Sequence, residues 1–170
     1  TPDGPIFETG AILLWLSDRY GTLAPQADSP QRADFLKWLF FTSNTVHSAL
    51  RMTFYPEKYA GPDPAHQAAL RLTMQTALKR HLATLDARAA LRPIPLAIQF
   101  YLAALLRWSV LYPVQKDRNW FNLDDYPYLK QMCLTLETQP CTAAAQTAEG
   151  LGPTPFSSPR YATPPQGSAT

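Results

Sequence analysis

The sequence is poor in charge and in cysteine, and each shortage excludes a class of function. Only 16% of the 170 residues are charged, the formal net charge is +2, and the lysines and arginines form no run or stripe. Nucleic-acid-binding surfaces need clustered basic residues, so we expect no nucleic-acid partner. The two cysteines, Cys133 and Cys141, form no CxxC pair and make no metal-ligand spacing with the three histidines. We therefore expect two reduced thiols, typical of a cytoplasmic protein, and no metal.

The chain also lacks an apolar run long enough to cross a membrane. The longest candidate, Leu96–Leu111, is apolar on nearly every side but contains Gln99, Arg107 and Ser109. A membrane-spanning helix needs roughly 20 apolar residues. This shorter run is better interpreted as the central buried helix of a bundle, and no membrane partner is expected.

Apolar residues and prolines are abundant, and together they define the fold class. Apolar residues make up 46% of the chain, with four Trp, eight Tyr and eight Phe, which is enough for one domain with a real core. From residue 30 onward the apolar residues recur at helical spacing between proline and glycine breaks. The pattern predicts a mainly α protein with helices over residues 30–54, 65–90, 96–111, 127–138 and 140–149.

Both ends of the chain differ from this helical pattern. Ile6 and Phe7 are typical of a strand stub, and a short helix over 11–19 follows and stops at Gly21. A lone strand has no partner for its backbone groups, which favours further sequence in front of it. Residues 152–170 have no periodic apolar pattern and predict an extended tail, with Phe156 and Tyr161 as the side chains able to pin it to the body.

Several local strings, taken in order, resemble the bacterial glutathione transferases over residues 1–151. They are Glu8-Thr9, Arg32-Ala33-Asp34, the stretch 101–108, Tyr126-Pro127-Tyr128-Leu129 and Glu149-Gly150-Leu151. The resemblance implies a helical bundle like the family's C-terminal domain, preceded by a remnant strand and helix of a thioredoxin-like α/β domain. It divides the chain into that remnant (1–21), a linker (22–29), the helical domain (30–151) and the Pro-rich tail (152–170).

Two departures from the family pattern stand out. The family's catalytic Ser, Cys or Tyr lies near the start of the thioredoxin-like domain, and no residue of this sequence matches it, so we assign no catalytic residue and expect a fragment. Members also begin the central helix with a Ser/Thr-x-x-Asp capping box, whereas Leu96 and Gln99 stand at those positions. Loss of such a cap typically costs about 1 kcal/mol.

The resemblance implies a binding site in two parts. In the family, the acidic residue and the hydroxyl at the Glu8-Thr9 corner grip the γ-glutamyl end of glutathione, and a helix N-terminus favours a carboxylate. The alternative is that Thr9 merely caps a helix and Glu8 is a solvated acid. For the electrophile pocket, the candidates are Asn44, His47, Arg51, Tyr55 and Trp108. Three of these candidates also have an interpretation without a role in ligand binding. His47 would be hydrogen-bonded within the protein, Trp108 would belong to the core and Arg51 would be a surface charge.

The first functional hypothesis is a cytoplasmic, homodimeric glutathione S-transferase that acts in detoxification. Glutathione would be its co-substrate and a small hydrophobic electrophile its second substrate, without a metal. The alternative is a non-catalytic, glutathione-transferase-like module for protein interaction, which would keep the helical domain without the catalytic segment. A third option is a decaying gene product with no stable fold.

Overall fold

Helices make up the regular structure in the part of the chain that the computed structural model describes, residues 1–2, 4–113 and 119–163. In chain order they are α1 (Thr9–Tyr20), α2 (Arg32–Phe40), the π-helix η1 (Phe41–His47), α3 (Ser48–Phe54), α4 (Glu57–Ala60), α5 (Pro64–Leu91), α6 (Leu96–Leu111), the short 3-10 helix η2 (Leu123–Asp125), α7 (Pro127–Glu137) and α8 (Pro140–Glu149). The predicted mainly α fold is confirmed.

Proline and glycine set most of these boundaries locally. Pro64, Pro127 and Pro140 occupy the first helical positions of α5, α7 and α8, where their missing N–H costs nothing. At the start of α5 the Asp63 carboxylate also accepts a hydrogen bond from the Ala65 amide at 2.8 Å. These local signals explain why the expected helix limits lie within a few residues of the observed ones.

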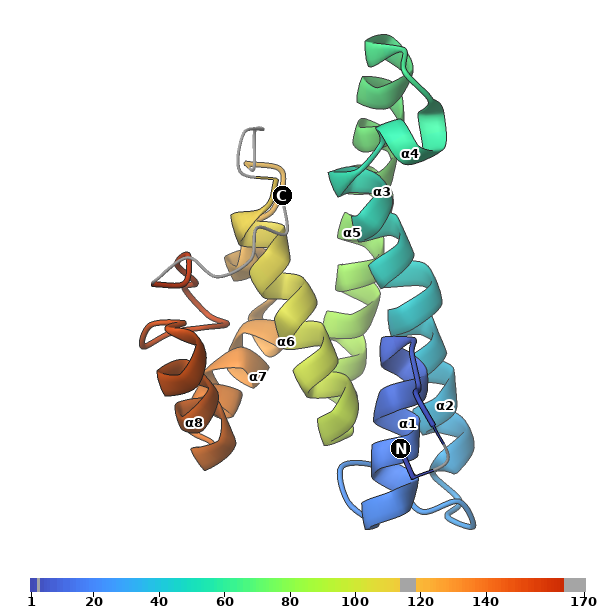
Figure 1. Ribbon diagram of the computed structural model, residues 1–170, viewed down its shortest axis with the longest axis vertical. Coiled ribbons are helices and arrows are strands. Elements are labelled where there is room, and N and C mark those ends of the chain that lie inside the picture. The colour runs from blue at the N-terminus through green and yellow to red at the C-terminus, as the bar shows by residue number, and fades with distance from the viewer. Residues whose placement is uncertain (3, 114–118, 164–170) are drawn as a thin grey trace.

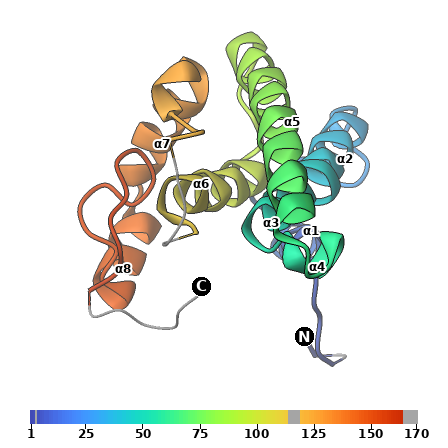
Figure 2. The same ribbon diagram turned by 90° about the horizontal axis from the view of Figure 1, so that it is seen from above.

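The centre of the molecule is α6, as its composition predicted. Figure 2 shows α6 between the group α1 to α5 on one side and the pair α7 and α8 on the other. Ile98, Leu102 and Ala103 are completely buried, and nine of the 16 residues of α6 are buried in all. Among the described residues, no helix combines the length and apolarity needed to cross a membrane.

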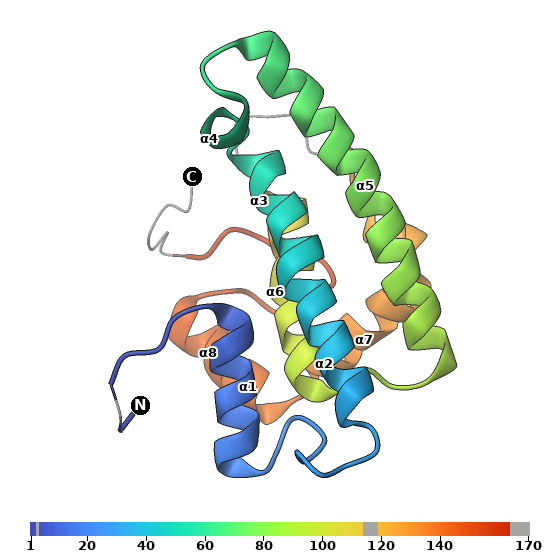
Figure 3. The ribbon, with the colours of Figure 1, turned by 90° about the vertical axis from the view of Figure 1, so that its right-hand side faces the viewer.

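The predicted long helix over 30–54 exists as three helical segments in line, α2, η1 and α3 (Figure 3). The middle segment, Phe41–His47, is a π-helix, whose i→i+5 bonding gives a wider turn than an α-helix. The N-terminal helix α1 packs across it, since a Cβ placed on Gly10 would lie 3.4 Å from the Ser43 side chain. Figure 1 shows α3 and α6 diverging toward their C-terminal ends.

Asp34 on α2 ties that helix to α5 and the loop after it. Its carboxylate pairs with Lys37 at 2.8 Å, Arg88 at 3.0 Å and Arg92 at 2.9 Å. The hydrogen bond from Lys37, followed by those contacts with Arg88 and Arg92, holds the pKa of Asp34 at about 2, although burial acts in the opposite direction. Asp34 is therefore ionised whenever the protein is near neutral pH.

One expectation about local structure is wrong, and another, the missing side-chain cap of α6, is confirmed. Ile6 and Phe7 form no strand, because no second strand is present among the described residues to accept their backbone hydrogen bonds. The start of α6 has no side-chain cap, as Leu96 and Gln99 predicted. One of its first backbone amides nevertheless finds an acceptor outside the helix. The Ala97 amide donates to the Leu23 carbonyl at 3.0 Å, and Leu23 takes a left-handed φ of 72° to present that carbonyl. Leu23, far from α6 in the sequence, thus supplies the acceptor that the missing side-chain cap would have provided.

The tail is fixed to the body over its described part. Phe156 packs against the hydrophobic core, and the Tyr161 hydroxyl donates to the Leu111 carbonyl at 2.7 Å. Both side chains expected to pin the segment therefore do so, although it forms neither helix nor strand up to Thr163.

Candidate functional site

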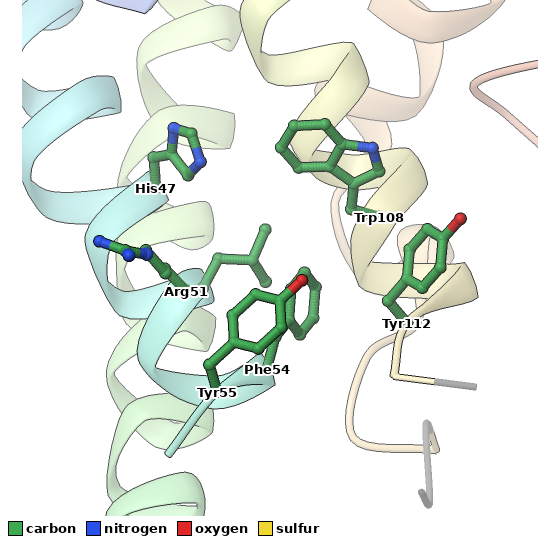
Figure 4. A pocket seen from close by; sticks show the side chains of 7 residues that line it. His47, Arg51, Phe54, Tyr55, Trp108 and Tyr112 are labelled. Atoms are coloured by element: carbon green, nitrogen blue, oxygen red, sulfur yellow. The ribbon is translucent and has the colours of Figure 1, made fainter. Parts of the chain in front are cut away.

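A pocket of about 230 Å³ lies between the α2–η1–α3 line and the C-terminal half of α6. It is lined by His47, Leu50, Arg51, Phe54, Tyr55, Trp108 and Tyr112 (Figure 4). An apolar cavity of about 150 Å³ is enough to hold benzene. The pocket therefore has room for a small, one- or two-ring aromatic group.

Four of the five candidate pocket residues come together in this lining: His47, Arg51, Tyr55 and Trp108. Asn44 does not; it is exposed, and its side-chain oxygen accepts from the Ser43 hydroxyl at 3.0 Å. In an α-helix Asn44 would share a face with His47 and Arg51. It lies in the π-helix η1 instead, where the wider turn rotates it away from that face.

Three lining residues, Leu50, Phe54 and Tyr112, were not among the predicted candidates. Helical spacing contains the signal for two of them, because Leu50 and Phe54 follow His47 by three and seven positions and so share its helix face. Tyr112 lies one residue beyond α6 with an extended backbone, so the spacing from Trp108 does not place its side chain.

His47 is held at the inner end of the pocket by Tyr101. Its Nδ1 atom lies 2.7 Å from the Tyr101 hydroxyl, and the two rings meet edge to face. The Trp108 ring lies on another side of the His47 imidazole, with the two ring centroids 5.7 Å apart. Burial, and then the charge of Arg51, keep the pKa of His47 below its usual 6.5, while Glu8 acts in the opposite direction. The imidazole is therefore neutral at pH 7, with one nitrogen engaged by Tyr101.

Tyr101 itself is buried and connects two parts of the molecule. Burial raises the pKa of its hydroxyl; a hydrogen bond with the Thr9 side chain lowers it, and the Glu8 charge raises it further. The N-terminal corner of α1 therefore lies beside the same residues that hold the pocket's inner end. Tyr101 lies within the stretch 101–108 and was not among the predicted site residues.

The Glu8-Thr9 corner is exposed and conformationally unusual. Glu8 has a φ of 70°, in the left-handed region that a residue with a side chain rarely adopts. No side chain caps α1, whose first residue is Thr9, so a Thr9 cap does not match the geometry, whereas the exposed Glu8 agrees with the other half of that alternative, a solvated acid. An uncapped helix N-terminus presents free N–H groups and a positive dipole end, which favour an anion.

The pocket residues can bind an apolar group and polarise a substituent on it. Its walls are mainly aromatic and aliphatic, and Arg51 adds a permanent positive charge at the exposed side. Cys133 lies elsewhere, fully buried in α7, where burial raises the pKa of its thiol to about 12. Within the described ranges no cluster of three or more His, Cys, Asp or Glu side chains is arranged to hold a metal ion.

Comparisons with known proteins point to one family. An uncharacterised GST-like protein of Streptococcus mutans serotype c is 32% identical over 104 residues, which span 61% of this chain and 38% of that relative. A beta-class glutathione S-transferase of Sphingomonas chungbukensis matches with a TM-score of 0.65 and 25% identity over 84% of this chain and 67% of its own. These matches support assignment to the glutathione transferase family.

A second solved glutathione S-transferase, from a sphingomonad and in complex with glutathione, matches with a TM-score of 0.67 and 27% identity. It aligns with 86% of this chain and 69% of its own length. No family model matches the chain. The chain thus spans well under half of its curated relative, and its helices have the arrangement of a glutathione transferase C-terminal domain.

Proposed function

We propose that this chain takes part in glutathione transfer, with glutathione at the Glu8-Thr9 corner and a small hydrophobic electrophile in the pocket. The observation that carries the proposal is the adjacency of the two sites. The Tyr101 hydroxyl lies 2.7 Å from Nδ1 of His47 at the pocket's inner end, and both the Thr9 side chain and the Glu8 charge are close enough to shift its pKa. A molecule bound at the corner is therefore next to one bound in the pocket, as a transfer between them requires.

At the corner, the carboxylate of Glu8 would accept from the α-amino group of glutathione. The Thr9 hydroxyl and the first amides of α1 would bind its α-carboxylate. Non-glycine residues at positive φ cost of order 1–3 kcal/mol and cluster at binding sites, so the φ of 70° at Glu8 supports this role.

In the pocket, the aromatic walls formed by Tyr55 and Trp108 would hold the electrophile's apolar part. Arg51 would attract an anionic or electron-withdrawing substituent, and neutral His47 would offer one hydrogen bond. We assign no residue of this sequence to formation of the thiolate, which is the nucleophile in glutathione transfer.

The wider features of the first hypothesis belong to this proposal. They are a role in detoxification, assembly as a homodimer and a cytoplasmic location, the last supported by two free cysteines. The division into a thioredoxin-like remnant (1–21), linker (22–29), helical domain (30–151) and tail (152–170) is proposed on the same basis.

The test is calorimetric titration of the 170-residue chain with glutathione and with S-hexylglutathione. We expect S-hexylglutathione to bind at least tenfold tighter, because burying two methylenes contributes about 1.6 kcal/mol. Glu8→Gln and Thr9→Val should weaken both ligands. The matched controls Glu57→Gln, in the exposed first turn of α4, and Thr22→Val, just after the C-cap of α1, should not.

The alternative, a non-catalytic interaction module, has the same fold and predicts a different result. A folded chain that binds neither ligand at millimolar concentration would favour it and would contradict the transfer proposal. Equal affinity for the two ligands would agree with glutathione binding at the Glu8-Thr9 corner. It would also show that the pocket does not bind the hexyl group.

A further inference from the structure

The segment 153–163 folds back along α6 and is held there by the half-buried side chains of Arg107 and Glu137. Arg107 donates to the carbonyls of Pro155 at 2.9 Å and Arg160 at 2.7 Å. The Glu137 carboxylate on α7 accepts from the amides of Phe156 and Ser157, both at 2.8 Å. Bonds to charged groups are the stronger kind, so this turn is anchored at two separate points.

The far end of the segment returns to the end of α8. The Thr163 amide donates to the Gly150 carbonyl at 3.0 Å. The approach is so close that a Cβ on Gly150 would lie 2.1 Å from the Thr163 oxygen. Only glycine fits there, so the residues just before Thr163 are fixed relative to the helical body.

Tyr161 lies within this fixed stretch and reaches the pocket wall. Its hydroxyl donates to the Leu111 carbonyl at 2.7 Å, and its ring meets the Tyr112 ring edge to face at 6.2 Å. Tyr112 in turn lies 6.4 Å from the Phe54 ring on α3. Tyr112 is thus held between a ring of the pocket and a ring of the tail, and it connects α6 to α3 where these helices diverge.

Tyr112 needs such support because it follows the last residue of α6. Its backbone is extended, with φ −122° and ψ 154°, so the helix no longer restricts its side chain. Figure 4 shows Tyr112 and Trp108 on the α6 side of the pocket, opposite Phe54, Tyr55 and Arg51. The position of the Tyr112 ring therefore decides how far the pocket extends beyond Trp108.

We propose that Tyr161 is a positioning residue that holds Tyr112 against Phe54 and so limits the size of the aromatic group that the pocket accepts. The inference rests on the proposed use of the pocket for an apolar electrophile. An edge-to-face contact of this kind corresponds to roughly a three- to tenfold change in an equilibrium constant. That range sets the expected size of the effect.

The experiment measures dissociation constants of benzenesulfonate and naphthalenesulfonate for the full 170-residue chain, by competition with anilinonaphthalene sulfonate fluorescence. Each ligand pairs an aryl group with one anion for Arg51, and the readout is the ratio of the two constants. Tyr161→Ala should shift the ratio toward naphthalenesulfonate by roughly three- to tenfold. Tyr161→Phe, which keeps the ring, should leave it near the wild-type value.

A double-mutant cycle tests whether Tyr161 acts through Tyr112. Tyr112→Ala should shift the ratio in the same direction, and adding Tyr161→Ala to it should change nothing further. Tyr128→Ala is the matched control, because Tyr128 is an exposed tyrosine of α7 that is 51% accessible and absent from the pocket lining. It should behave as wild type.

Three outcomes would overturn the inference. One is an unchanged ratio in Tyr161→Ala, and another is a full further shift when Tyr161→Ala is added to Tyr112→Ala; either leaves the pocket proposal standing. The third is that the wild-type chain binds neither aryl sulfonate, which removes the pocket and this inference together. Glutathione binding, measured separately, still reports on the Glu8-Thr9 corner in every case.

Discussion

We expect Gly150→Ala to lower the free energy of unfolding by about 2 kcal/mol, from two separable causes. Gly150 has φ 61° and ψ 35°, and an L-residue in this left-handed conformation costs about 1 kcal/mol. The new Cβ would also lie 2.1 Å from the Thr163 oxygen, so the segment must move away. The hydrogen bond from the Thr163 amide to the Gly150 carbonyl is then lost, which costs about another 1 kcal/mol.

Gly21→Ala is the matched control for the first cause alone. Gly21 ends α1 with φ 65°, nearly the same strain, but the nearest atom to its added Cβ is the Gln26 side-chain nitrogen at 3.6 Å. That is an ordinary contact, so this variant should lose about 1 kcal/mol and leave the tail in place. The difference between the two variants isolates the docking of residues near Thr163.

Urea denaturation gives the two free energies of unfolding, and trypsin reports on the tail directly. Arg160 is exposed, so cleavage after it depends on whether the segment around it is held. Under native conditions cleavage after Arg160 should be faster in Gly150→Ala than in Gly21→Ala or wild type. Equal destabilisation of the two variants with equal cleavage rates would refute the reasoning, because Thr163 would then not pass over Gly150.

Three further predictions concern titration and reactivity. Because burial and Arg51 lower the pKa of His47, its contribution to stability should be present above about pH 6.5 and be lost as pH falls through the lowered value; His47→Gln should flatten the urea-midpoint profile there. Asp34, with its pKa of about 2, should contribute stability above its usual 3.8 that disappears as pH falls toward 2, and Asp34→Asn should remove that dependence. In the native protein a thiol reagent should label exposed Cys141 and spare buried Cys133, as read by mass spectrometry.

Each of these three predictions has an outcome that would contradict it. A urea-midpoint profile for His47→Gln that falls as steeply as wild type between pH 7 and 5 would show that its titration is uncoupled from folding. An Asp34→Asn variant whose urea midpoint still falls at acid pH as in wild type would show that titration of the Asp34 carboxylate is uncoupled from folding. Equal labelling of the two cysteines at neutral pH would contradict the burial of the Cys133 thiol in α7.

The helical layout was largely predictable because it depends on neighbours in sequence. Pro127 and Pro140 begin helices since their fixed φ and missing N–H suit only the first turn, and Gly21 ends one since it tolerates positive φ. The nearly all-apolar run Leu96–Leu111 had to become the central helix, because no exposed position would suit it. Helical spacing likewise brought His47 and Arg51 onto one face.

Only the tertiary structure decided the features that join residues far apart in the chain. The π-helix around Asn44 rotates it out of the pocket, and packing of α1 against Ser43 accompanies that turn. Leu23 caps α6 with its carbonyl, and Tyr161 reaches Tyr112 from the tail. Each of these contacts depends on how whole helices are placed, and no local propensity encodes that placement. The sequence by itself therefore determined which segments are helical and which faces are apolar, while packing decided which side chains share the pocket and what fixes its limits.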